Sequence, residues 1–431
     1  MAIPFSGKTY IDALLARDDD NILGQPSSGD GGIDWTLTGT VGTATTVKYV
    51  WDETLIRSDL QGGVTSLETM TANQQFAMIQ AFMRWSDVAK VTFQEVTNTA
   101  GLTPDSSAFQ LALANGVIAN TPTLNITGLT KSIETTGVSG DSVNKAAIYL
   151  DNIDLTNKGT ITTAYNVGGK GYETAIHEVG HLLALEHPNG MEGDTPITDP
   201  RWLNNSLSIM SYNHWNGYNA SGPMIYDIAA AQYLYGANTS YNSGNTIYGG
   251  PDNIGPYHVR FDGTQKAWTI WDAGGTEDVF DFSGSPSNRN LKLDLRGGVD
   301  DKGTATLTDD VVRFSEIGDE RIAIAFDPSH YNTDGSLKPG KSGVVDIEIA
   351  KGGAGDDTII GGYVANTLHG GAGNDKVYDP SSKTISGDYL YGDTPGSTLA
   401  GGNDTLWGGS NTFLYGGGGA NDNATCTRIA A

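Results

Sequence analysis

The sequence is poor in cysteine, in basic residues and in long apolar runs. Cys426 is the only cysteine among 431 residues, so an internal disulfide is excluded and core packing or bound metal ions must hold the fold. The chain has no run near the roughly 18 consecutive apolar residues of a membrane-spanning helix, so we expect no membrane insertion. Residues 1–20 lack a basic start and a long apolar stretch, and we expect no Sec-type signal peptide there.

The charge is strongly one-sided. Fifty acidic residues against 25 basic ones give a net charge of -25, which repels phosphate backbones and anionic membrane surfaces, so we expect no nucleic-acid partner. An acidic surplus either serves solubility or groups carboxylates around cations such as calcium. The position of the acidic residues decides between these two explanations.

Before about residue 240 the pattern mixes helices and strands. Thr71 and Gln74 form a plausible capping box for a helix that runs to about Val88. Large apolar side chains share one face of this helix: Phe76, Ile79 and Met83. Three short stretches have the alternation or β-branched content of strands: 48–51, 91–96 and 146–150.

Two further helices are predicted. Residues 172–185 are apolar at helical spacing, which predicts a helix packed on a core. A last helix over 226–235 is stopped by Gly236, a residue that favours the position after a helix. We therefore place the end of the first domain near residue 240.

Glycine, with 58 residues, thickens towards the carboxyl end and falls into phase. Residues 352–360 and 370–378 fit the nonapeptide GGxGxDxUx, where U is a large apolar residue, and the unit between them has Asn366 in place of the aspartate. The phase is interrupted over 379–397, after which a degenerate array recovers part of it.

These repeats predict calcium binding, because tight glycine turns can surround a hard cation with carboxylate and main-chain oxygens. The candidate calcium ligands are Asp357, Asp375, Gly353, Gly355, Gly371 and Gly373. The alternative is a flexible glycine-rich linker. A linker would not place Ile359, Leu368 and Val377 at a fixed nine-residue interval.

The residues His177-Glu178-Val179-Gly180-His181 form an H-E-x-x-H motif. On a helix its two histidines, four residues apart, lie on one face and can grip one ion. His187 offers a third nitrogen and leaves the fourth tetrahedral position open, as catalytic zinc requires. The alternatives are a helix with histidines that bind no metal, or structural zinc, which usually adds a cysteine that this segment lacks. The other histidines, His214, His258, His330 and His369, have no ligand spacing.

The segment HEVGHLLALEHP resembles the metzincin zinc signature H-E-x-x-H-x-x-G-x-x-H, and its final proline is similar to the serralysin branch. Residues 208–212, Ser-Ile-Met-Ser-Tyr, resemble the serralysin Met-turn. The resemblance implies that Met210 lies beneath the metal and that the Tyr212 hydroxyl lies beside it. One departure is Ala184, where the family has glycine; at positive φ, alanine costs on the order of 1 kcal/mol more than glycine.

The resemblance covers nearly the whole chain and implies its architecture. We expect an α+β metzincin-like catalytic domain over 1–240, followed by an all-β parallel β-roll with calcium-binding repeats over 241–431. The family usually continues to an apolar carboxyl-terminal secretion signal, which the ending of this chain does not match. Truncation of the second domain, a divergent signal and an altered reading frame are the three alternatives.

The function implied is that of a secreted zinc endopeptidase with broad specificity for protein or peptide substrates. Zinc would activate the attacking water, Glu178 would accept its proton, and Tyr212 would stabilise the oxyanion. The resemblance further implies a monomer exported by the type I secretion machinery of a Gram-negative bacterium. An alternative is a calcium-dependent binding or adhesion module without activity. A metal-dependent glycan hydrolase is a third possibility, but the sequence shows no paired carboxylates for it.

Overall fold

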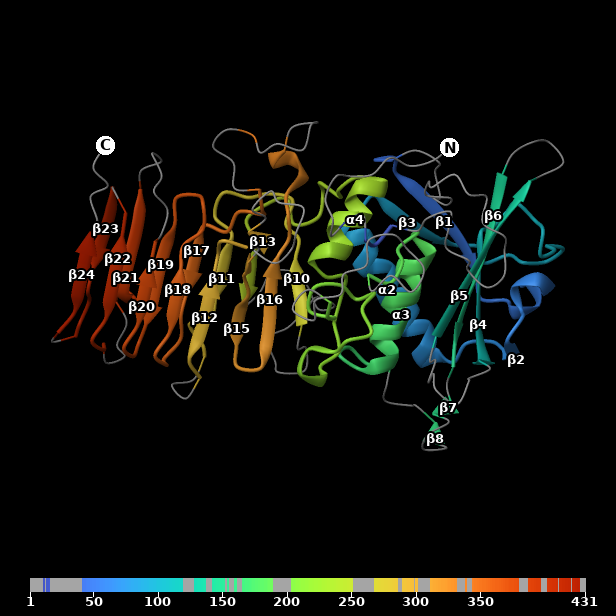
Figure 1. Cartoon of the computed structure of the whole chain (residues 1–431), viewed down its shortest axis with the longest axis horizontal. Coiled ribbons are helices and arrows are strands. Elements are labelled where there is room, and N and C mark those ends of the chain that lie inside the picture. Colours follow the sequence, from blue (N-terminus) through green and yellow to red (C-terminus); the bar gives the residue numbers. More distant parts are fainter. Residues whose placement is uncertain are drawn as a thin grey trace. The chain divides into compact units, whose positions relative to one another are not determined.

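The computed structural model describes the following residues: 11, 13–15, 41–118, 128–136, 142–151, 153–154, 159–160, 165–188, 203–250, 267–285, 289–297, 299–300, 311–331, 338, 343–379, 387–396, 401–409, 411–419 and 421–426. They form two compact units, Met1–Asn238 and Thr239–Ala431. Figure 1 shows the helices and strands of both units.

Unit 1 combines a twisted sheet with helices. The strands of the sheet are β1 (Thr45–Val50), β2 (Val64–Glu68), β3 (Val91–Glu95), β4 (Leu111–Ile118), β5 (Gly128–Thr136) and β6 (Ser142–Leu150). Their order is β3-β1-β4-β6-β5, with β2 paired to β4. The pairs β1–β3, β1–β4 and β4–β6 are parallel, whereas the edge strand β5 runs antiparallel to β6. The predicted strands at 48–51, 91–96 and 146–150 are confirmed as parts of β1, β3 and β6.

The helices and short elements of unit 1 are η1 (Glu53–Leu55), η2 (Ser58–Leu60), α2 (Ala72–Val88), β7 (Ile153–Asp154), β8 (Gly159–Thr160), α3 (Lys170–Leu182), η3 (Trp215–Gly217) and α4 (Ile225–Tyr235). Strands β7 and β8 pair with each other as a small antiparallel ladder. Helix α2 begins with the predicted capping box, in which Gln74 N donates to Thr71 Oγ1 and Thr71 N donates to Gln74 Oε1. The prediction of this helix is confirmed.

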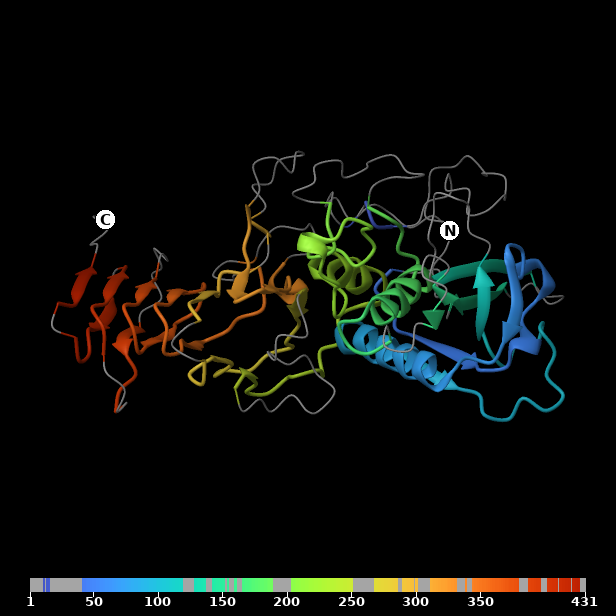
Figure 2. The ribbon, with the colours of Figure 1, turned by 90° about the horizontal axis from the view of Figure 1, so that it is seen from below.

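The face of α2 that predicted the helix is the exposed one. Phe76, Ile79 and Met83 are 41%, 42% and 36% exposed. The helix instead buries the face that carries Met78 and Trp85, and Trp85 Nε1 donates to Ile176 O of α3 at 3.0 Å. The helices α2 and α3 therefore lie against each other, as the two views show (Figures 1 and 2).

Helix α3 ends three residues earlier than the sequence predicted, at Leu182. The chain turns there because Ala184 adopts φ +65°, a conformation that no α-helix contains. Helix α4 matches its prediction within one residue and ends where Gly236 adopts φ +82°.

Unit 2 is built from two sheets. The strands of the first are β10 (Ala267–Ile270), β12 (Leu291–Asp294), β15 (Ser315–Ile317), β16 (Glu320–Ile324), β18 (Thr358–Ile360), β20 (Lys376–Tyr378), β22 (Thr405–Gly408) and β24 (Asn423–Cys426). Those of the second are β9 (Ile247–Gly249), β11 (Val279–Asp281), β17 (Ile349–Lys351), β19 (Thr367–Gly371), β21 (Asp388–Asp393) and β23 (Thr412–Tyr415). The remaining elements are β13 (Val299–Asp300), β14 (Val311–Val312) and η5 (Pro328–His330).

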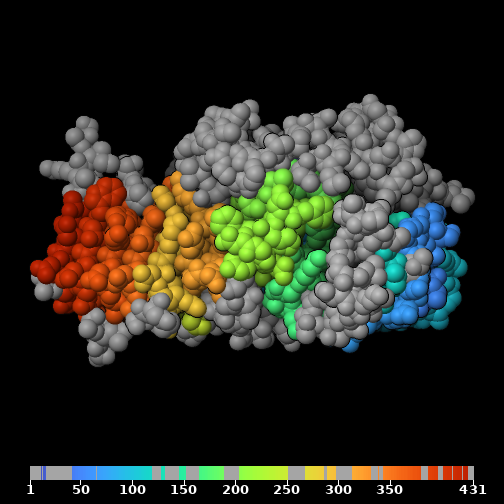
Figure 3. Space-filling view, turned by 60° about the horizontal axis from the view of Figure 1, so that its bottom comes forward, coloured from blue at the N-terminus to red at the C-terminus, as the bar shows by residue number. Residues whose placement is uncertain are grey.

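From β17 onwards successive strands alternate between the two sheets, and every pairing within this part is parallel. Each coil therefore contributes one strand to each sheet, and the coils lie side by side in the space-filling view (Figure 3). The large apolar residue of each repeat points between the sheets: Ile359, Leu368, Val377, Leu390 and Leu406 are fully buried. The repeats fit a β-roll.

Candidate metal centre and repeat site

Three histidines of unit 1 converge on one point. Their Nε2 atoms lie 3.2 Å apart for His177 and His187 and 3.1 Å apart for His181 and His187. One ligand atom from each of the three lies within 4.8 Å of the others, so the triad could hold a metal ion. The spacing of the two histidines on α3 and the turn after it bring the three rings together.

Main-chain carbonyls fix the orientation of two of these rings. Nδ1 of His177 lies 2.8 Å from Ile209 O, and Nδ1 of His181 lies 2.8 Å from Leu185 O. Because a carbonyl only accepts, each Nδ1 is the protonated nitrogen, and each Nε2 keeps a free lone pair that faces the point of convergence. This is the tautomer that a metal ligand needs.

Burial keeps the imidazoles neutral. It lowers the pKa of His177 to about 4 and, with the neighbouring histidine, that of His187 to about 3. The pKa of His181 is lowered in the same direction by burial and by the two other rings. Neutral imidazole is the form that coordinates metals, so at neutral pH no proton competes for these ligand atoms.

Glu178 lies on the same helix, and its side chain is turned towards strand β5. Thr130 Oγ1 donates to Glu178 Oε2 at 2.7 Å and fixes the carboxyl group. Burial raises the pKa of Glu178 to about 7. Gly128 leaves the room for this carboxyl, because a Cβ there would lie 2.7 Å from Glu178 Oε1.

The two residues singled out in the predicted Met-turn, Met210 and Tyr212, differ in solvent exposure. Met210 is fully buried, whereas Tyr212 is 58% exposed. The ring centroid of Tyr212 lies 4.4 Å from that of His187 and 5.7 Å from that of His177. Met210 packs under α3, where a Cβ on Gly180 would lie 2.5 Å from its Sδ.

Sequence reasoning assigned no role to Asp227 or Thr130. The buried carboxyl of Asp227 accepts from Ser208 Oγ and Ile209 N at 2.6 Å and from Met224 N at 2.7 Å. Asp227 therefore holds the main chain of Ile209, the residue whose carbonyl oxygen orients the His177 ring. An aspartate at the third position of a helix is a capping signal, so the sequence could have indicated a capping role for Asp227. It could not have indicated the contact with Ile209.

The remaining histidines stay apart from the triad. His214 lies 3.7 Å from Glu173, His330 lies 3.2 Å from Asp327, and His369 stacks on Tyr391. His258 lies outside the described residues.

In unit 2 the repeat aspartates form a column along one edge of the roll. Asp357 N donates to Asp375 Oδ1 at 2.8 Å, Asp375 N donates to Asp404 Oδ1 at 2.9 Å, and Asp404 N donates to Asp422 Oδ1 at 3.1 Å. The other carboxylate oxygen of both Asp375 and Asp404 is buried and has no hydrogen-bond partner among the described residues. Buried oxygens without a donor are what a hard cation requires.

The turns between these strands stack closely. A Cβ on Gly371 would lie 2.1 Å from Gly353 O, and a Cβ on Gly373 would lie 2.4 Å from Gly355 O. Only glycine permits this approach, which brings main-chain carbonyls next to the aspartate column.

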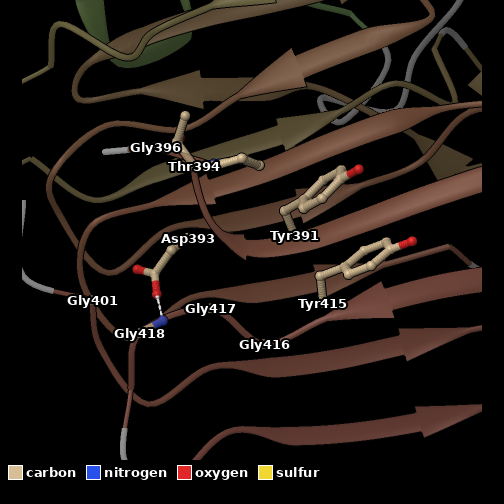
Figure 4. Close-up of a pocket in the computed structure, with 10 residues that line it drawn as sticks. Tyr391, Asp393, Thr394, Gly396, Gly401, Tyr415, Gly416, Gly417 and Gly418 are labelled. Carbon is tan, nitrogen blue, oxygen red and sulfur yellow. Dashed lines mark hydrogen bonds between the residues drawn. The ribbon is translucent and has the colours of Figure 1, made fainter. Parts of the chain in front are cut away.

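The second array keeps the column although its sequence is degenerate. Neighbouring aspartates are 18 residues apart in the first step, 29 in the second and 18 again in the third. Asp404 and Asp422, which the sequence analysis did not assign, therefore continue the column. The longer step includes Asp393, which stands in register with Gly371, accepts a hydrogen bond from Gly418 N and lines a pocket beside Tyr391 and Tyr415 (Figure 4).

These features define a class of protein in which a histidine triad next to a glutamate is followed by glycine-rich nonapeptide repeats. The profile of the RTX calcium-binding nonapeptide repeat matches residues 343–378. No helix among the described residues is long and apolar enough to cross a membrane.

The chain is related to the serralysin-type metalloproteases. It is 30% identical over 331 residues to "Metalloprotease AprA" of Pseudomonas entomophila (strain L48), covering 72% of this chain and 55% of the relative. It is 30% identical over 304 residues to "Serralysin" of Proteus mirabilis, covering 66% and 53%. It is 28% identical over 363 residues to "Serralysin G" of Dickeya chrysanthemi, covering 78% and 64%. The chain thus spans somewhat more than half the length of these relatives, and the resemblance predicted from its motifs is confirmed.

Proposed function

We propose that this chain is a secreted zinc endopeptidase that hydrolyses peptide bonds in proteins with broad specificity. Unit 1 would be a metzincin-like α+β catalytic domain and unit 2 a calcium-binding β-roll. The observation that carries the proposal is the convergence of three neutral imidazoles beside a buried glutamate with a raised pKa. Such a pairing of metal ligands and a general base is typical of metal-assisted hydrolysis.

The donor set fits zinc. Unit 1 offers three nitrogen ligands and contains no cysteine in its sequence, and two of the imidazoles are backed by main-chain carbonyls. This donor set matches a catalytic rather than a structural zinc site. His177, His181 and His187 would hold the ion. When bound, zinc supplies Lewis acidity, which polarises a water molecule and the substrate carbonyl.

Glu178 would act as the general base. Its pKa of about 7 suits a group that takes a proton from water and returns it to the leaving amine at neutral pH. Thr130 holds the carboxyl by its hydroxyl group and leaves one oxygen, Oε1, on the side of Gly128.

Tyr212 would stabilise the developing oxyanion. Its ring is exposed next to His187, so its hydroxyl can donate to a substrate oxygen. Partial burial of the phenol against the site and the nearby Glu178 and Glu186 raise its pKa above the usual range, although the side chain as a whole stays accessible. The phenol is therefore protonated at neutral pH and can donate a hydrogen bond. Met210 would have a structural role beneath the site.

Calcium would bind along the aspartate column of unit 2. Asp357 and Asp375 would supply carboxylate oxygens, and Gly353, Gly355, Gly371 and Gly373 would supply carbonyls; we extend the column to Asp404 and Asp422. The similarity to serralysins and the repeats support export by a type I secretion system to the extracellular space. A monomeric enzyme is part of the same proposal.

The test of the metal site is the zinc content of the calcium-loaded chain, measured by elemental analysis beside a His187→Ala variant. We expect one zinc per parent chain and less than stoichiometric zinc in the variant after dialysis, because one of three ligands is lost. A folded parent without zinc would contradict the proposal and favour a calcium-dependent binding module.

A further inference from the structure

The third histidine is carried by a strained turn. Ala184 has φ +65° and is buried, so its side chain makes this turn costlier than the same turn with glycine. Leu185 N donates to Gly180 O at 3.0 Å, and Leu185 O receives the proton of His181 Nδ1. The turn between Ala184 and Glu186 therefore contributes to the orientation of one ligand and sets the position of the next.

A segment about 170 residues earlier in the chain packs on this turn. Ile11, Leu14 and Leu15 are 8%, 0% and 3% exposed. Leu14 N donates to Ile11 O at 2.9 Å, and Leu14 O accepts from Glu186 N at 2.8 Å. Leu15 forms an antiparallel bridge with Leu185. Two consecutive residues of the turn are thus held by two consecutive residues of the amino-terminal segment.

We propose that Leu14 and Leu15 are positioning residues for the metal site: they clamp the 184–186 turn so that the His187 imidazole stays where those of His177 and His181 meet. The contact joins the residue directly before His187, since Glu186 N is the donor to Leu14 O. The buried leucine side chains anchor the segment that supplies this acceptor. The inference rests on the proposed zinc site. It adds the amino-terminal segment with Leu14 and Leu15 to the parts of the chain that position the zinc ligands.

The clamp is needed because the positive φ of Ala184 is unfavourable for alanine. Released from the clamp, the turn can relax towards negative φ, which moves His187 away from the other two nitrogens. Groups that orient metal ligands contribute to affinity without touching the metal. Zinc and the clamp then stabilise the same conformation, so each should strengthen the other.

The test compares zinc dissociation constants, measured by competition with a chromophoric chelator, in the full calcium-loaded chain. We expect the double variant Leu14→Ala, Leu15→Ala to bind zinc about tenfold more weakly, as for other outer-shell partners. The matched control is Leu55→Ala, Leu60→Ala, which removes two equally buried leucines from a core cluster that excludes the turn. We expect its zinc affinity to equal that of the parent.

Rescue separates positioning from a general loss of stability. Adding Ala184→Gly to the Leu14→Ala, Leu15→Ala variant should restore most of the zinc affinity, because glycine adopts positive φ without strain. Equal affinity of the parent and the clamp variant, equal losses in the clamp and control variants, or no rescue by glycine would overturn the clamp. A parent that binds no zinc would instead contradict the proposed function.

Hydrogen exchange of the parent keeps the inference testable if the clamp variant does not fold. Zinc should slow exchange of the Glu186 amide, which donates to Leu14 O. Exchange of this amide that is the same with and without zinc would overturn the inference.

Discussion

Gly180 and Gly128 have no functional group, yet both decide where functional side chains lie. Gly180 lets Met210 approach helix α3, and Gly128 leaves room for the Glu178 carboxyl. Because packed interiors tolerate little extra volume, a methyl group at either position would displace its neighbour. The geometry of the candidate centre therefore depends on small residues as well as on ligands.

Tyr212 gives a prediction at the scale of one hydroxyl group. We expect Tyr212→Phe to lower kcat by about 10²-fold or more, since removing one donor to an oxyanion typically costs that much. KM should change little, because the hydroxyl acts where charge develops. Steady-state kinetics on a peptide substrate checks this, with zinc content as the control; an unchanged kcat would remove Tyr212 from the mechanism.

The sequence allowed prediction of the three histidines and Glu178 because they lie close together within residues 177–187, and because His177 and His181 are about one helical turn apart. Thr130 and Asp227 could not be predicted in the same way. Thr130 reaches Glu178 from strand β5, 48 residues away, and Asp227 reaches Ile209 from helix α4. Such contacts are made by tertiary packing, which leaves no local spacing to recognise.

Among the elements, helix α2 shows the limits of periodicity. Its apolar spacing predicted a helix correctly, but the stripe of Phe76, Ile79 and Met83 faces outwards. A second apolar face, with Met78 and Trp85, packs on α3. Periodicity identifies the helix, whereas the choice between two apolar faces depends on the partner.

The aspartate column gives a prediction for one coil of the roll. We expect Asp404→Ala to lower the number of calcium ions bound or to weaken the weakest site, because it removes a buried oxygen and the acceptor for Asp375 N. Calorimetric titration with calcium measures both. The exposed Asp319→Ala, which makes the same change in charge, is the control. Equal calcium binding by both variants and the parent would show that Asp404 binds no calcium.

The sequence predicted the first repeat array because its nine-residue period is unbroken. The aspartates of the second array were not predicted as calcium ligands because an insertion interrupts the period. Asp404 follows Asp375 after 29 residues instead of 18, yet the two are hydrogen-bonded in the same way as their neighbours. Strand register, which restores the column after the insertion, is a property of the folded roll.

For the whole molecule, the acidic surplus makes stability depend on calcium and pH. Burial and neighbouring aspartates raise the pKa of Asp375 to about 8, and burial raises that of Asp357 and of Asp404 to about 6. The neighbours that raise the pKa of Asp375 are Asp357, Asp404 and Asp356. Asp356 also raises the pKa of Asp357, and Asp393 and Asp422 raise that of Asp404. An unfolded aspartate titrates near 3.9.

The calcium-free roll therefore binds more protons than the unfolded chain between about pH 4 and pH 8, and its stability falls as pH rises through this range. Calcium binds the deprotonated carboxylates, so calcium affinity rises over the same range. We expect urea denaturation with a calcium chelator to give lower stability of unit 2 at pH 8 than at pH 5, and added calcium to stabilise more at pH 8. The opposite order with the chelator would contradict this reading of the column.

The most direct test of the central claim is casein hydrolysis by the zinc- and calcium-loaded chain beside a Glu178→Gln variant with the same zinc content. The account predicts that the parent cleaves casein, that a zinc chelator stops cleavage, and that the variant binds zinc but does not cleave. A folded parent that holds both metals and leaves casein intact, or a variant as active as the parent, would contradict the account.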